Sequence, residues 1–136
     1  MSDYTIRAIT DVPDIFDGHY PGAMRFMTDA LEARQLALTH RLMPPRSGGK
    51  GSYGHRHKTQ EEIYYVVSGK LQFKLENEVI DVPAGSAVRV APAVTRSIWN
   101  DGPGDAELLI CSIRLDDPHA DGELIDNFWP ENRAQE

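Results

Sequence analysis

The sequence has a single cysteine, no long apolar run and no excess of positive charge. Because Cys111 stands alone, the chain can form neither an internal disulfide nor a cysteine-rich metal site. No stretch approaches the roughly 20 apolar residues that span a bilayer, and MSDYTIRAITDVPD lacks the basic start and apolar core of a signal peptide. The net charge of -7 disfavours nucleic acid and anionic membrane surfaces as partners. We therefore expect a cytoplasmic protein that binds neither.

Several catalytic signatures are also missing. The sequence contains no phosphate loop, no dinucleotide fingerprint and no G-x-S-x-G nucleophile elbow. A chain of 136 residues suffices for one domain with one core and leaves too little for a second catalytic lobe. Any active site should therefore lie inside that core or at a subunit interface.

Short segments between glycines and prolines show apolar residues that alternate, which is the pattern of strands. This alternation runs through LALTHRLM at 36–43 and KLQFKL at 70–75. Hairpin turns are expected at Ser68-Gly69 and at residues 83–85, each joining two strands. Several such strands predict an all-β antiparallel sandwich or barrel.

Two segments at the ends of the chain are less regular. For AMRFMTDALEARQ at 23–35, a helix and a strand leading into a turn both fit the spacing of apolar residues. The acidic tail carries Phe128 and Trp129, and large aromatic side chains near a terminus usually cover a core or a partner subunit. We expect the tail to be ordered to about Trp129.

The segment GHRHKTQEE at 54–62 is the candidate metal site. If it is extended, His55 and His57 project to one face about 6–7 Å apart, where two imidazoles can converge on an ion. A glutamate at the start of the next strand adds an oxygen donor, and by parity only one of Glu61 and Glu62 can point at the ion. Such a set suits iron, manganese, nickel, zinc or copper. The alternative is a solvated pair, because H-x-H alone is weak evidence.

The wider pattern resembles the first conserved motif of the cupin superfamily. From Gly49 to Gly69, GKGSYGHRHKTQEEIYYVVSG matches glycine, five residues, H-x-H, three or four residues, glutamate, about six residues and glycine. The resemblance assigns the family's metal-binding roles to His55, His57 and Glu62. It implies a divalent metal ion, such as iron, zinc, nickel or manganese.

A second stretch is similar to the second cupin motif in spacing but not in chemistry. In GSAVRVAPAVTRSIWN, Gly85 to Asn100, alanines replace the expected proline and glycine, and Arg96 stands where the third histidine ligand belongs. An arginine cannot ligate a metal through a lone pair. Three protein ligands with open positions remain, as in non-haem iron enzymes.

The resemblance implies a single cupin domain over residues 1–136. We expect an all-β jelly-roll barrel of antiparallel strands with at most short helical segments, covering about 35–115. An N-terminal arm, 1–34, and a C-terminal tail, 116–136, complete the domain. Cupins commonly pair sheet edges, so a homodimer is expected.

Three accounts of Arg96 stay open. Arg96 could point into the barrel beside a three-ligand metal and hold an anionic substrate, either carboxylate or phosphate. It could instead pair with Glu62, with loss of the metal. In the third account His40 supplies the missing ligand, although a hydrogen-bonded core histidine is the alternative for that residue. Tyr64 shares the face of Glu62 and is the tyrosine expected to line the pocket, whereas Tyr53 and Tyr65 are expected to pack.

The leading functional hypothesis is a metal site acting on a small organic molecule, anionic if Arg96 binds it, as an oxygenase or an isomerase or cyclase. Arg96 and Tyr64 are its candidate catalytic residues. A non-catalytic small-molecule-binding module is the first alternative. A sugar-phosphate isomerase or epimerase is the second, with Tyr64 or His40 as its general base.

Overall fold

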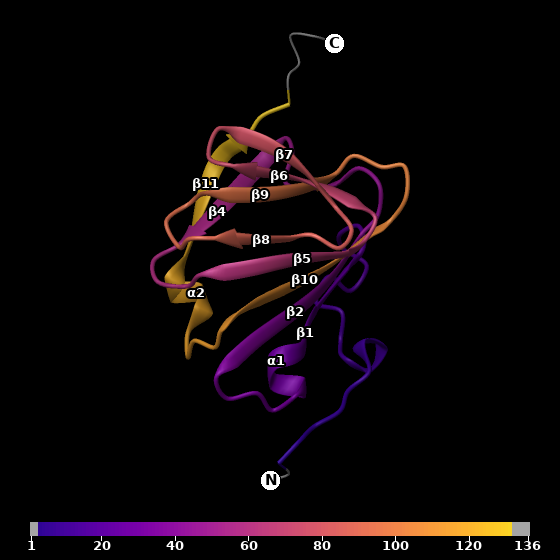
Figure 1. Ribbon diagram of the computed structural model, residues 1–136, viewed down its shortest axis with the longest axis vertical. Coiled ribbons are helices and arrows are strands. Elements are labelled where there is room, and N and C mark those ends of the chain that lie inside the picture. Colours follow the sequence, from indigo (N-terminus) through magenta and orange to yellow (C-terminus); the bar gives the residue numbers. More distant parts are fainter. Residues whose placement is uncertain (1–2, 132–136) are drawn as a thin grey trace.

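The computed structural model describes residues 3–131, which form two facing β-sheets (Figure 1). The first sheet has the spatial order β1 (Ala23–Phe26), β2 (Leu36–Met43), β10 (Ala106–Ile113), β5 (Glu62–Ser68) and β8 (Ala87–Val90). The second has the order β11 (Gly122–Trp129), β4 (Ser52–His57), β9 (Arg96–Asn100), β6 (Lys70–Leu75) and β7 (Glu78–Pro83), with β3 (Ser47–Gly48) paired to β9. The described helical segments are short: η1 (Ile9–Asp11), α1 (Met27–Ala30) and α2 (Pro118–Asp121). The predicted all-β jelly roll of antiparallel strands is confirmed. No helix in the described part is long and apolar enough to cross a bilayer.

The two predicted turns are present, but they do not close hairpins. Gly69 and Gly85 have φ values of 76° and 85°, the left-handed region that favours glycine. However, β5 pairs with β10 and β8 in the first sheet, whereas β6 pairs with β7 and β9 in the second. Each turn therefore carries the chain from one sheet to the other. The hairpin expectation was wrong because turn residues mark a reversal of direction without specifying which strands pair.

The two irregular segments extend the sheets. Residues 23–30 combine both expected forms, because strand β1 is followed directly by the single turn α1. In the tail, β11 pairs with β4, and Trp129 at its end is buried. The prediction that the tail is ordered to about Trp129 is confirmed, and its residues 122–129 form an integral strand of the second sheet.

The inward faces of the sheets enclose one core. Its members are apolar side chains from both sheets together with one tyrosine, namely Met43, Tyr64, Val66, Leu71, Phe73, Val82, Val90, Ile98, Ala106 and Leu108. Because side chains alternate along a strand, the buried Met43 fixes the orientation of β2. Arg41 therefore shares the inward face of β2, and His40 points the other way.

Candidate metal centre and adjoining cavity

Three side chains of the predicted metal site converge. His55 and His57 alternate along β4 and project to one face, with ring centroids 5.1 Å apart. Glu62 begins β5, and its Oε1 lies 3.5 Å from His55 Nε2 and 3.4 Å from His57 Nε2. One potential ligand atom from each residue lies within 4.8 Å of the others. The strand geometry thus brings together two nitrogen donors and one oxygen donor.

The orientation of His57 is set by Asp121, at the end of α2. His57 Nδ1 lies 3.2 Å from Asp121 Oδ2. Hydrogen bonds from the Thr59 hydroxyl lower the pKa of Asp121, against the effect of its burial, and the Gln60 and Thr59 amides lower it further. A carboxylate only accepts hydrogen bonds, so Nδ1 of a neutral His57 carries the proton and Nε2 the lone pair. That Nε2 is buried and has no hydrogen-bond partner among the described residues.

Glu62 is held as a carboxylate. Burial raises its pKa, but the imidazoles of His55 and His57 and the hydroxyl of Tyr64 outweigh burial and leave the pKa well below the ordinary value of 4.5. The Tyr64 hydroxyl donates a 2.6 Å hydrogen bond to Oε1. Burial, and then the negative charge of Glu62, raise the pKa of Tyr64 well above 10.0. Tyr64 therefore keeps its proton at neutral pH and donates a hydrogen bond to Glu62.

Arg96 lies directly beside this group. On β9 it is opposite His55 of β4, and its side chain is fully buried. Arg96 Nε lies 3.7 Å from Glu62 Oε1, and its two terminal nitrogens donate to the carbonyls of Pro92 and Ala91. Arg96 therefore points inward, in contact with Glu62, while its guanidinium also anchors the loop before β9.

His40 does not join the cluster. Its Nε2 lies 3.2 Å from Glu107 Oε2 of the neighbouring strand, and its side chain is buried on the face of β2 opposite Arg41. Among the described residues the convergent group is His55, His57 and Glu62 alone. The structure thus gives His40 the role of a buried, hydrogen-bonded histidine and does not support the account in which it supplies a ligand.

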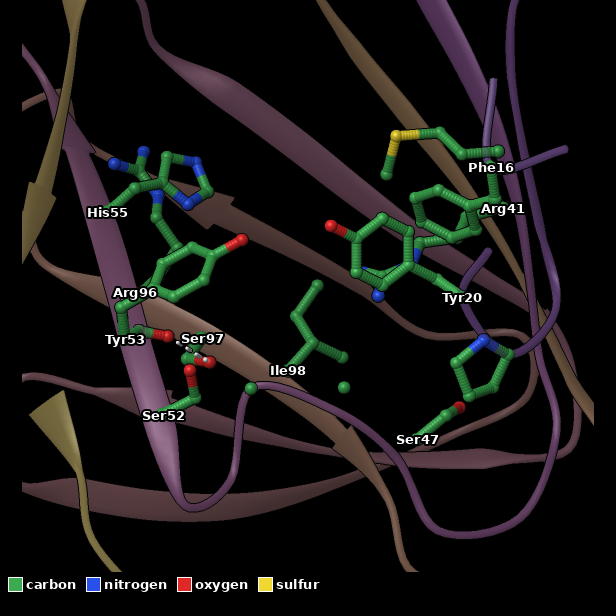
Figure 2. Close-up of a pocket in the computed structure, with 15 residues that line it drawn as sticks. Phe16, Tyr20, Arg41, Ser47, Ser52, Tyr53, His55, Arg96, Ser97 and Ile98 are labelled. Atoms are coloured by element: carbon green, nitrogen blue, oxygen red, sulfur yellow. Dashed lines mark hydrogen bonds between the residues drawn. The ribbon is translucent and has the colours of Figure 1, made fainter. Parts of the chain in front are cut away.

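A cavity of about 530 Å³ adjoins the cluster, with His55 and Arg96 in its wall (Figure 2). Phe16, Tyr20 and Pro21 of the N-terminal arm form part of its lining, as do Tyr53 of β4 and Arg41 of β2. Tyr20 and Tyr53 remain 66% and 51% exposed, so their rings are available to a bound molecule. The cavity falls within the usual size range of small-molecule sites.

Comparison with known proteins identifies the family. Residues 42–112, just over half of the chain, match the cupin domain. The chain belongs to the cupin family. An uncharacterised protein of Methanocaldococcus jannaschii is 33% identical to this cupin over 72 residues, which are 53% of this chain and 57% of that protein. The chain thus spans little more than half the length of that relative.

Solved structures share the fold at low sequence identity. A cupin protein from Bacteroides fragilis is 22% identical, with a TM-score of 0.66, over 85% of this chain and 88% of that chain. The polyketide cyclase RemF from Streptomyces resistomycificus is 18% identical, with a TM-score of 0.70, over 94% of this chain and 88% of that chain. At these identities the likeness establishes the fold of this cupin alone.

Sequence reasoning missed several residues around the centre. Neither Asp121, in the acidic tail, nor Arg41, in LALTHRLM, received a role from the sequence. Asp117-Pro118 was an available signal, because an N-cap aspartate followed by proline predicts a helix start, and the Asp117 side chain does accept from the Ala120 amide. For Arg41 the sequence offered no such signal, because parity places it on the face of Met43 without saying which face is inward. Tyr53, expected to pack, lines the cavity, whereas Tyr64, expected to line it, is buried in the core and is not among the lining residues.

Proposed function

We propose that this cupin binds a divalent cation through His55, His57 and Glu62 and acts on a small organic molecule in the adjoining cavity. The proposal rests on the environment of the His57 Nε2 atom. It is buried without a hydrogen-bond partner, and it faces Glu62 while Asp121 holds the opposite ring nitrogen. A buried polar atom without a partner is costly, and a bound cation would satisfy it.

The residues present fit a metal. Two imidazoles and a carboxylate suit iron, zinc, nickel or manganese. When bound, iron would supply oxygen chemistry, whereas zinc, nickel or manganese would supply Lewis-acid chemistry for isomerisation or cyclisation. RemF, which shares the fold, is a polyketide cyclase, so cyclisation is among the reactions to test.

The chain's own residues supply positioning. Asp121 orients His57, and the Tyr64 hydroxyl and Arg96 hold Glu62 in its ionised form. His55 is partly exposed and borders the cavity, so a bound molecule would meet the centre there. The aromatic side chains that line the cavity would exclude water from a molecule lying between them.

A non-catalytic binding module is the second candidate. It is favoured by the number of side chains that already surround one carboxylate oxygen of Glu62. Glu62 Oε1 lies within 3.7 Å of His55, His57, Tyr64 and Arg96 atoms. A carboxylate surrounded in this way is compensated without an ion, since Arg96 supplies a full positive charge. In this account the cavity captures a small molecule without turnover.

The sugar-phosphate isomerase hypothesis gains no support from the site. It needs a general base near neutral pH. Tyr64 has a pKa raised by burial and by Glu62, so its hydroxyl stays protonated. His40 lies on the face of β2 that turns away from the cavity. The two named bases are therefore unsuited to the role.

We also propose a homodimer, as the resemblance to cupins suggested. The outward face of β5 carries three apolar side chains, Ile63, Tyr65 and Val67, each more than 40% exposed. Burying these side chains against a second copy would remove apolar surface from water. Light scattering should give twice the chain mass, whereas a monomer would contradict the proposal. The cytoplasmic location stays a prediction from the sequence.

Elemental analysis tests the metal site directly. Protein purified without chelator should contain near-stoichiometric metal, and the variant His55→Ala/His57→Ala should lose it. His119→Ala is the matched control, because His119 is exposed at α2 and lies outside the convergent group. Absence of metal from the wild type, even after incubation with iron, zinc, nickel and manganese, would favour the binding module.

A further inference from the structure

The cavity contains a second guanidinium that the proposed metal centre does not use. Arg41 projects from the inward face of β2, and its Nε is buried without a hydrogen-bond partner. The described residues include no carboxylate that pairs with it. Its guanidinium carbon lies 5.7 Å from the centre of the Phe16 ring, a cation–π contact that does not neutralise its charge.

A half-buried arginine whose Nε is buried without a partner is unfavourable on its own. Burial lowers the pKa of Arg41, but a guanidinium stays charged in proteins. Buried charges are normally paired or bound to a ligand. Arg41 therefore lacks a counter-anion, and the open cavity beside it is where one could enter.

Arg96 is less suited to hold a ligand than Arg41. Its side chain is fully buried, its terminal nitrogens donate to two backbone carbonyls and its Nε faces Glu62. In Figure 2, Arg96 lies beside His55 at one end of the cavity, and Arg41 lies at the other end, behind Tyr20. The cavity thus has a proposed metal end and a separate cationic end.

We propose that Arg41 binds the carboxylate of a flat, largely apolar organic acid, whose body lies between Tyr20 and Tyr53 and whose far end reaches His55. This inference rests on the proposed function of the same site and specifies its substrate class. Arg41 is the positioning group for the acid, and the centre at the other end meets the remainder of the molecule.

The lining of the cavity favours an aromatic carboxylate over a sugar phosphate. Figure 2 shows the rings of Tyr20 and Tyr53 on either side of the open space, and their hydroxyls, directed towards it, could hydrogen-bond a polar substituent on the aromatic acid. Phe16, Met24 and Ile98 add apolar surface. A guanidinium fork matches one carboxylate in a bidentate contact, and no lysine lies among the described lining residues to help neutralise a phosphate dianion.

The test is calorimetric titration of the protein as purified with three probes that share a naphthalene body. These are 2-naphthoate, the neutral 2-naphthamide and 2-naphthyl phosphate. We expect 2-naphthoate to bind, and the amide to bind about tenfold to a hundredfold more weakly because it lacks the charge that Arg41 recognises. The phosphate should bind more weakly than the carboxylate.

The same titrations on variants assign the effect to Arg41. Arg41→Met should weaken 2-naphthoate binding about tenfold to a hundredfold and leave 2-naphthamide binding nearly unchanged. Arg46→Met is the matched control, because Arg46 is exposed and pairs with Asp101, and it should bind both probes as the wild type does. Circular dichroism checks that Arg41→Met folds, and the acid-against-amide comparison in the wild type stands without any variant.

Three results would overturn the inference: no 2-naphthoate binding, equal affinity for acid and amide, or tighter binding of the phosphate. Metal content measured on the same samples separates this inference from the proposed function. If the wild type contains metal but does not bind 2-naphthoate, the acid subsite is rejected and the metal centre is not. Charge-dependent 2-naphthoate binding by a protein that takes up no metal would reject the metal centre and leave the Arg41 subsite standing.

Discussion

His57 and Asp121 lie 64 residues apart in the chain, yet His57 Nδ1 is 3.2 Å from Asp121 Oδ2. The contact exists because β11, which follows α2, pairs with β4 and places Gly122 opposite His57. The C-terminal tail therefore does more than cover the core. It supplies the carboxylate that fixes the tautomer of a proposed metal ligand.

Asp121→Asn should weaken metal binding about tenfold to a hundredfold, because the partner that orients a histidine ligand contributes that much to affinity. The amide would also present a donor towards His57 Nδ1 or the Gln60 amide, where the carboxylate only accepts. Competition with a chromogenic chelator measures the change. Asp126→Asn, at an exposed position of β11, is the control and should bind metal as the wild type does. If Asp121→Asn bound metal as tightly as Asp126→Asn, Asp121 would make no contribution to the metal site.

Arg96→His should raise metal affinity by at least about tenfold, because it removes a positive charge 3.7 Å from Glu62 and adds a nitrogen donor. Arg96→Met separates these two effects, since it removes the charge without adding a donor. Calorimetric titration with zinc and nickel measures both variants. The donor is important if the histidine variant binds more tightly than the methionine variant. Unchanged affinity in both would mean that Arg96 does not oppose metal binding at all.

Most of the fold could be predicted because local patterns determine it. The alternation in LALTHRLM and KLQFKL gave the bounds of β2 and β6 as the structure has them. Which strands pair could not be predicted, because the turns at Gly69 and Gly85 look like hairpin turns whether or not the chain changes sheet. Pairing depends on packing between the sheets, and that information is not local.

The site residues likewise include some that the sequence could predict and some that it could not. His55, His57 and Glu62 lie within eight consecutive residues, so spacing and a family motif were enough to predict their convergence. Asp121 and Arg41 reach the site through pairings of β11 and β2 that no nearby residue signals. The inward side of β2 became evident only when Met43 was seen in the core.

In metal-free protein, the stability that ionised Glu62 contributes should be lost on acidification. Its pKa is lowered in the folded state, so the unfolded chain takes up the proton first, and the free energy of unfolding falls as pH drops below about 4.5. Glu62→Gln lacks this proton uptake, so its slope should be shallower by up to about 1.4 kcal/mol per pH unit. Urea denaturation at several pH values in chelator measures the slopes. Glu61→Gln, at an exposed position, should follow the wild type, and an equal slope in Glu62→Gln would contradict the prediction.

Gly69→Ala should destabilise the protein more than Gly85→Ala, although the two glycines have similar positive φ values. The shared backbone strain costs about 1 kcal/mol for an alanine. At Gly85 a Cβ would meet nothing within 4 Å, whereas at Gly69 it would lie 2.6 Å from the Asp105 carbonyl oxygen and 2.8 Å from Ala106 Cα. This backbone cannot yield easily, so Gly69→Ala should cost about 1–3 kcal/mol more in the free energy of unfolding. Equal losses in urea denaturation would mean that the motif glycine at 69 is needed for its conformation alone, not for the close approach of β10.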